Sequence, residues 1–296
     1  MRSFLAAVSV VVILMWAVSG LAWAGSLQAV ASFAIIADFA KAVGGERVDV
    51  VSLVPASADP HSWEPTVREA RSLAGADVLF INGEGYEEWL ADLAASSARP
   101  NLPIIELSEG LAAMSGPSHS VHHDHDDPHF WLSVPNAIHY VEKICQAFAE
   151  LDPAGAEYYQ ERAEKYINEL WELDSWLQEQ LAVIPKENRV IVTYHNAFAY
   201  FAERYGFSAV EFLVSNPERE PTAQEMAALI RALAKMKRPV IFSEPQFNIG
   251  ERYVKSVAAE VGADVRVLYS ATLTEAIPTY VDLMRYNGQV LVEALR

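Results

Sequence analysis

Cysteine is almost missing from this sequence, because Cys145 is the only one among 296 residues. A single cysteine excludes an intramolecular disulfide and a thiolate zinc site. Any metal must therefore be bound through nitrogen and oxygen atoms. Cys145 lies among apolar residues at helical spacing, which predicts a small buried hydrophobe rather than a reactive thiol.

Positive charge is also scarce. The chain has 22 Lys and Arg against 39 Asp and Glu, a formal net charge of −17. This balance argues against a nucleic-acid partner, whose phosphates require a basic face. The chain also lacks the H-E-x-x-H pattern of metalloproteases and any nucleophile elbow, so we expect no enzyme activity.

Residues 1–24 read as a targeting segment. Arg2 gives a positive start, residues 5–21 are almost wholly apolar, and a small-x-small pattern ends at Ala24. These features predict a cleaved signal peptide and a periplasmic mature protein. A membrane anchor is the alternative, because the apolar run approaches the ~20 residues that span a bilayer. No cysteine lies near the cleavage site, which argues against a lipid anchor.

Short apolar strands and amphipathic helices alternate twice along the mature chain, which predicts an α/β fold with parallel sheets. Between the two sets, one uninterrupted helical pattern of ~30 residues would be ~45 Å long. We therefore expect two similar α/β domains, residues 25–151 and 185–296, joined by a long helix over 152–184. A binding cleft should lie between the domains.

Five of the eight histidines lie between residues 117 and 131, together with three aspartates. Imidazole is the commonest protein ligand for zinc and also suits copper, nickel and iron, so this stretch indicates a metal. A polar surface loop is the alternative, because a His-rich tract is only a compositional signal.

A repeated D-P-H-x-W pattern separates one of these histidines from the rest. It occurs at residues 59–63 and 127–131 and contains His61 and His129. His195 directly follows a predicted strand, and ligands bind beyond the carboxyl ends of strands in open α/β sheets. These three histidines are the candidate metal ligands. His139 lies inside a predicted helix and is expected to be structural or surface-facing.

Several motifs resemble those of the solute-binding proteins of bacterial zinc and manganese ABC importers. The resemblance covers nearly the whole mature chain and includes the segments at residues 59–65, 75–83, 127–132, 194–202, 243–247 and 280–287. It implies two α/β domains bridged by a long helix, with one metal ion in the interdomain cleft.

The resemblance also implies roles for individual residues. His61 and His129 match the two ligands of the first domain, and His195 matches a third ligand that is typically histidine in zinc-binding members. We therefore expect a zinc-type protein with one tight site. The tract 117–128 resembles the insertion of zinc-binding members, so His119, His122, His123 and His125 are expected to add weaker accessory binding.

One position departs from the family pattern. Ala271 stands where many members have a fourth, aspartate ligand. Water, Glu275 or a histidine of the loop is then left to fill the fourth position. Glu244 resembles a family-typical residue near the cleft, and a structural carboxylate that orients its neighbours is the simpler interpretation.

The expected function is capture of zinc in the periplasm and delivery to an ABC permease at the inner membrane. A monomer is expected, and a metallochaperone is a second candidate partner. The alternatives are a manganese-binding member, a metal-dependent adhesin of the same family, and a three-histidine zinc hydrolase.

Overall fold

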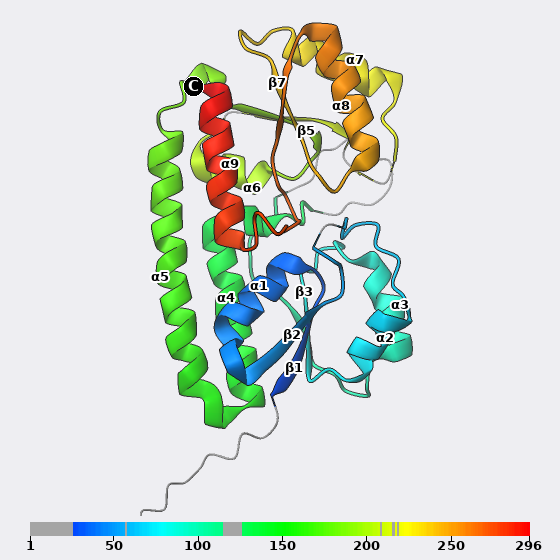
Figure 1. The fold of residues 1–296 in the computed structure, drawn as a ribbon, viewed down its shortest axis with the longest axis vertical. Helices are drawn as coiled ribbons and strands as arrows, with labels where there is room; N and C mark the ends of the chain where they lie inside the picture. The colour runs from blue at the N-terminus through cyan, green and yellow to red at the C-terminus, as the bar shows by residue number, and fades with distance from the viewer. Residues whose placement is uncertain (1–25, 57, 115–125, 208, 215–216, 218) are drawn as a thin grey trace, which may run out of the picture.

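The computed structural model describes residues 26–56, 58–114, 126–207, 209–214, 217 and 219–296 (Figure 1). The predicted signal peptide and the four loop histidines from His119 to His125 lie outside the described residues. Among the helices that are described, none combines the length and apolar character needed to cross a membrane.

Two four-stranded parallel sheets have the same strand order. In the first sheet the order is β2-β1-β3-β4, and in the second it is β6-β5-β7-β8. Each sheet thus starts at an inner strand, steps to one edge, and returns across to the other side. The strands are β1 (Leu27–Ala31), β2 (Val48–Ser52), β3 (Val78–Ile81), β4 (Ile104–Glu106), β5 (Val190–His195), β6 (Ala209–Val214), β7 (Val240–Ser243) and β8 (Asp264–Val267).

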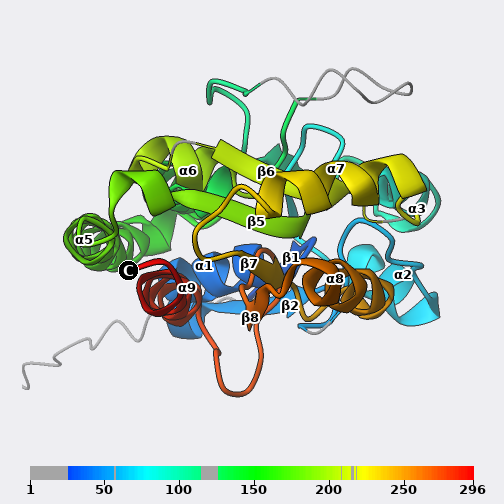
Figure 2. The ribbon, with the colours of Figure 1, turned by 90° about the horizontal axis from the view of Figure 1, so that it is seen from above.

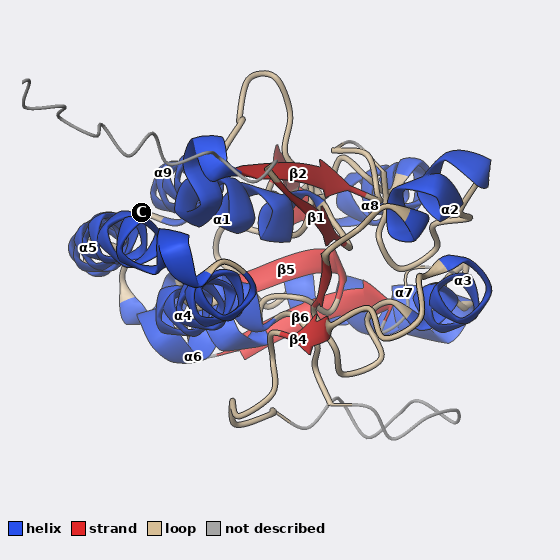
Figure 3. Ribbon diagram, turned by 90° about the horizontal axis from the view of Figure 1, so that it is seen from below, coloured by secondary structure: helices blue, strands red, loops and turns tan. Residues whose placement is uncertain are grey.

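Helices cover both faces of each sheet, because every central strand has apolar side chains on both sides. In β1, Ala29 and Ala31 join the large core, whereas Val30 points to a separate core beneath α2 and α3. The views along the molecule show these helical layers (Figures 2 and 3). The helices are α1 (Ala34–Gly44), α2 (Val67–Ala74), α3 (Glu88–Ser97), α4 (Val134–Leu151), α6 (Ala199–Tyr205), α7 (Ala223–Leu233), α8 (Asn248–Val261) and α9 (Tyr280–Leu295).

One long helix, α5 (Ala156–Leu181), runs beside both domains (Figure 1). It packs against α1 and α4 of the first domain and against α6 and α9 of the second. A short 3-10 turn, Pro153–Gly155, precedes it, and the Asp152 side chain accepts a hydrogen bond from Gly155 N. The expected architecture of two α/β domains and a long helix is confirmed, while the domain limits at 151/152 and 184/185 stay a prediction.

The two domains share one continuous core and several buried hydrogen bonds. Trp131 Nε1 donates to Ser270 O at 2.7 Å, and Tyr280 OH donates back to Trp131 O at 2.6 Å. Tyr200 OH of α6 donates to Asp127 O at 2.8 Å. These contacts hold the segment 127–131, which precedes α4 in the first domain, against the second domain.

Asp38 makes a further contact between domains. Its Oδ2 atom on α1 accepts a hydrogen bond from Tyr280 N at the start of α9, 2.9 Å away. Burial raises the pKa of the Asp38 carboxyl to about 6, against the lowering effects of the Tyr280 N–H, Lys41 and Tyr166. The ionised form is therefore disfavoured in the folded protein.

Replacing Asp38 by asparagine is expected to stabilise the metal-free protein at pH 7.5. The pKa of Asp38 is higher in the folded protein than in the unfolded chain, so the free energy of unfolding falls as pH rises from about 4 through 6. The asparagine amide does not titrate, so the variant does not lose this stability. The expected gain at pH 7.5 is about 2 kcal/mol, with little difference near pH 4. Urea unfolding of both proteins at the two pH values measures this, and a gain that does not change with pH would contradict it.

Candidate metal centre

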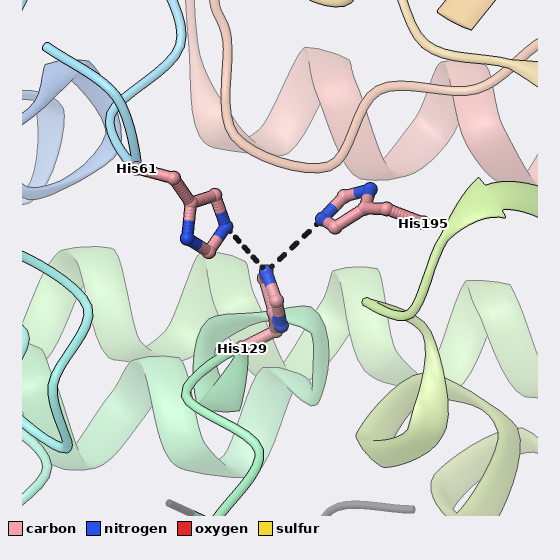
Figure 4. A group of neighbouring side chains, drawn as sticks. All are labelled: His61, His129 and His195. Carbon is pink, nitrogen blue, oxygen red and sulfur yellow. Dashed lines mark hydrogen bonds between the residues drawn. The ribbon is translucent and has the colours of Figure 1, made fainter. Parts of the chain in front are cut away.

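Two loops and the end of strand β5 bring His61, His129 and His195 together between the domains (Figure 4). His61 lies in the connection between β2 and α2, His129 directly precedes the 3-10 turn Phe130–Leu132, and His195 is the last residue of β5. The carboxyl ends of parallel strands are where open α/β sheets bind ligands. The topology therefore explains why residues so distant in sequence meet here.

The three imidazoles converge through their Nε2 atoms. His129 Nε2 lies 3.2 Å from His61 Nε2 and 3.3 Å from His195 Nε2. Two nitrogens each ~2.0 Å from one zinc ion at the tetrahedral angle would be about 3.3 Å apart. The two separations from His129 Nε2 thus match the spacing of ligands around a single ion, and the three ligand atoms all lie within 4.8 Å of one another.

A carboxylate orients the imidazole of His129. Asp127 Oδ1 lies 2.8 Å from His129 Nδ1 and also accepts the His129 backbone N–H at 3.0 Å. Both residues are almost fully buried, at 3% and 2% exposure. A carboxylate on Nδ1 keeps the proton there, so that the Nε2 lone pair is free for a metal ion.

A carboxylate also orients the imidazole of His195. Glu244, directly after β7, places its Oε1 atom 2.8 Å from His195 Nδ1. The other carboxylate oxygen accepts a hydrogen bond from Ser270 Oγ at 2.5 Å, and Gln246 Nε2 donates to that same hydroxyl at 2.7 Å. The interpretation of Glu244 as an orienting carboxylate agrees with this geometry.

His61 is held by its backbone and is the most open of the three. Its N–H donates to Asp59 Oδ1 at 3.0 Å, and Trp89 Nε1 donates to Pro60 O at 2.8 Å. Its side chain is partly exposed, whereas His129 and His195 are buried. Burial lowers the pKa of His61 well below its usual range, as do the neighbouring imidazoles. The candidate ligand His61 is thus held in its neutral form on the solvent side of the cluster.

Substituting Glu244 by glutamine should weaken zinc binding about tenfold, because the amide removes the negative charge that supports His195. Competition with a chromophoric chelator measures the change. Glu275→Gln is the control, since Glu275 is exposed and lies outside the histidine cluster. Equal zinc affinities for E244Q and E275Q would contradict the orienting role of Glu244.

The structure brings all three predicted ligands together. Of the candidates for a fourth ligand, Glu275 does not belong to the three-histidine group. Ala271 is buried, and within the described ranges no carboxylate joins the three-histidine group. His139 Nε2 donates a hydrogen bond to Glu109 O at 3.0 Å, away from the site, in agreement with a structural or surface-facing role. The loop histidines lie outside the described residues.

Sequence reasoning named Glu244 but missed the two aspartates that support His129 and His61. Asp127 and Asp59 both belong to the D-P-H-x-W repeat, in which the aspartate accepts the N–H of the histidine two residues later. The repeated aspartate was a usable signal, because Asx turns of this kind are local. Nothing in the sequence indicated the Trp89 contact to Pro60, because 29 residues separate them.

Comparison with known proteins shows the family of this chain. A family described as "Zinc-uptake complex component A periplasmic" matches residues 29–294. The manganese-binding lipoprotein MntA of Halalkalibacterium halodurans is 33% identical over 276 residues, covering 91% of this chain and 88% of the relative. The iron-binding protein YfeA of Yersinia pestis is 33% identical over 277 residues, covering 91% and 86%.

Two solved structures extend the comparison to the fold. The Mn-bound periplasmic metal binding protein of Candidatus Liberibacter asiaticus has a TM-score of 0.83 at 28% identity, covering 92% of this chain and all of that chain. A crystal structure of ZnuA has a TM-score of 0.80 at 27% identity with the same coverage. These relatives are metal-binding or uptake proteins, in agreement with the expectation that this chain is not an enzyme. The chain belongs to the family of periplasmic zinc-uptake component A.

Proposed function

We propose that this protein captures zinc outside the cytoplasmic membrane and delivers it to the permease of an ABC importer. The observation that carries the proposal is the convergence of three imidazole nitrogens, with Nε2 separations of 3.2 and 3.3 Å. The spacing fits one tetrahedral ion. The family match and relatives named as substrate-binding proteins of metal ABC transporters support the transport role.

The donor set favours zinc over manganese. Within the described residues the group contains imidazoles and no carboxylate, and manganese prefers carboxylate, carbonyl and water oxygens. Several relatives are named for manganese or iron, so the preference for zinc is specific to the ligands of this chain. Most nitrogen sites bind Cu²⁺ more tightly than Zn²⁺. The selectivity for zinc therefore also depends on which metal ions are available outside the cytoplasmic membrane.

The role requires a place outside the cytoplasmic membrane and a membrane partner. We infer export through the signal-like segment 1–24, followed by docking of the metal-loaded protein on a permease that works with an ATPase. Several relatives are named lipoproteins. Mass spectrometry of the protein from cell envelopes distinguishes a cleaved from a lipid-modified amino terminus.

Metal competition tests the proposal. The metal-free protein is titrated with zinc in the presence of excess manganese, and the reverse experiment is run in parallel. We expect one zinc ion per chain and no displacement of zinc by manganese. Displacement of zinc by equimolar manganese would contradict the assignment of zinc. Absence of a tight site for either metal would contradict the capture function itself.

The His-rich tract is proposed to collect zinc near the cleft through weaker sites. Deleting residues 118–126 is expected to remove the weak phase of a zinc titration and leave the tight site unchanged, because the tight site is built from the three distant histidines. Calorimetry of both proteins measures this. Loss of the tight site would show instead that the tract supplies a primary ligand.

A further inference from the structure

The three-histidine site leaves one position of a tetrahedral zinc ion without a ligand from the described residues. Zinc is almost always four-coordinate in such sites. Among the described residues no carboxylate joins the three histidines: Asp127 Oδ1 and Glu244 Oε1 face the Nδ1 atoms, and Asp59 binds the His61 N–H and Ser62 Oγ. If the proposed zinc function holds, an exchangeable oxygen ligand fills the fourth position.

Among the described residues, Tyr86 is the one hydroxyl-bearing side chain whose ring contacts two of the histidines. Its ring centroid lies 4.5 Å from that of His61 and 5.7 Å from that of His129, and the ring is wedged against Trp131 at 5.0 Å. The residue comes from the turn between β3 and α3 and is only 2% exposed. It therefore forms a wall of the site on the first-domain side.

The Tyr86 hydroxyl is buried and has no hydrogen-bond partner among the described residues. A buried unpaired polar group costs about 1–3 kcal/mol, and phenylalanine would pack the same space without this cost. The two other unpaired buried side-chain atoms in the described part of the chain are Trp63 Nε1 and Asp127 Oδ2. Both belong to the D-P-H-x-W segments, and Asp127, like Tyr86, directly contacts a histidine of the cluster.

The surroundings of the Tyr86 hydroxyl disfavour its ionised form. Burial is the main cause that raises the pKa of its hydroxyl well above the usual range, and the carboxylates of Asp59, Glu87 and Glu244 add to it. Asp59 accepts the His61 N–H, and Glu244 contacts the His195 ring, so the carboxylates that act on the phenol are those that support the ligands from both domains. A protonated phenol is a hydrogen-bond donor and acceptor rather than an anionic metal ligand.

We propose that Tyr86 is a positioning residue whose hydroxyl hydrogen-bonds to the solvent-derived oxygen that completes the coordination of the zinc ion. The hydrogen bond positions this oxygen, but the oxygen is not a protein side chain. It can therefore exchange when zinc is delivered. A hydrogen bond donated to bound hydroxide is stronger than one to bound water, because charged acceptors roughly double its strength. Tyr86 should therefore lower the pH at which the bound water loses a proton.

The test compares the full mature protein with Tyr86→Phe and Tyr159→Phe. Tyr159 is a matched control, because its buried ring carries a hydroxyl that donates to Asp152 at 2.9 Å, at the start of α5. Zinc affinity is measured by chelator competition, and the visible spectrum of the Co²⁺-loaded form is followed against pH. Thermal unfolding of the metal-free proteins checks that each variant folds.

We expect Y86F to weaken zinc binding about tenfold and to move the pH midpoint of the Co²⁺ spectrum upward, while Y159F changes neither. Identical affinity and midpoint for Y86F and the unchanged protein would overturn the proposal and leave Tyr86 as packing. A phenolate charge-transfer band in the Cu²⁺-loaded protein that Y86F removes would also overturn it, by making Tyr86 a direct ligand. Failure of the unchanged protein to bind zinc or Co²⁺ would instead contradict the proposed function.

Discussion

His129→Ala abolishes tight zinc binding if the three imidazoles form the site as proposed. His129 is the central ligand, because its Nε2 atom lies within 3.3 Å of both other Nε2 atoms. Structural zinc sites with four ligands bind with about 10–16 kcal/mol, or roughly 3 kcal/mol per ligand. Loss of this ligand should lower the affinity by at least about a hundredfold.

Chelator competition with H129A measures the loss, and His139→Ala is the matched control. His139 belongs to the same domain, but its ring contacts Glu109 O rather than the cluster. The control should keep full affinity. Equal affinities for the two variants would show that His129 is not a ligand. The metal-free H129A protein must first be shown to fold, because its substitution leaves the buried Asp127 carboxylate without an imidazole.

Trp131→Ala is expected to have the largest effect on stability, about 3–5 kcal/mol in the free energy of unfolding. Trp131 is fully buried and packs against Phe33 and Tyr86, with ring centroids 4.9 and 5.0 Å away. Its indole N–H also donates to Ser270 O in the other domain. Truncation therefore leaves both a cavity and an unpaired carbonyl at the junction of the domains.

Urea unfolding of the metal-free protein separates this effect from metal binding. Trp171→Ala is the control, because Trp171 lies on α5 with 45% of its surface exposed and should change stability little. Trp131→Phe should fall between the two, since it keeps most of the packing but loses the hydrogen bond to Ser270. A stability of W131A within 1 kcal/mol of the control would contradict the importance of this contact between domains.

The alternation of strands and helices was predictable because buried parallel strands are short apolar runs with polar ends. β3 (Val78–Ile81) is such a run, with Asp77 before it and Asn82 after it. Helix boundaries are less predictable where packing rather than capping sets them. α8 begins at Asn248, directly after the buried Phe247, which makes no side-chain cap hydrogen bond. α7, in contrast, begins at a capping box formed by Thr222 and Glu225, which is a local signal.

The histidines could be found from sequence because each one has a local signal, either the D-P-H-x-W repeat or a position after a strand. The pairing of His195 with Glu244 and the place of Tyr86 could not. Glu244 reaches His195 across 49 residues, and this pairing depends on β5 and β7 lying side by side in the sheet. Tyr86 reads as an ordinary turn residue until the fold places its ring beside His61. Contacts of this kind are set by tertiary structure rather than by periodicity.

Zinc X-ray absorption of the protein loaded with one equivalent of zinc tests the central claim most directly. The account predicts three imidazole nitrogens and one further light atom at ~2.0–2.1 Å, with no sulfur. His195→Ala should reduce the imidazole count to two, since His195 is the ligand supplied by the second domain. A spectrum with fewer than three imidazoles in the unchanged protein would contradict a site formed by His61, His129 and His195.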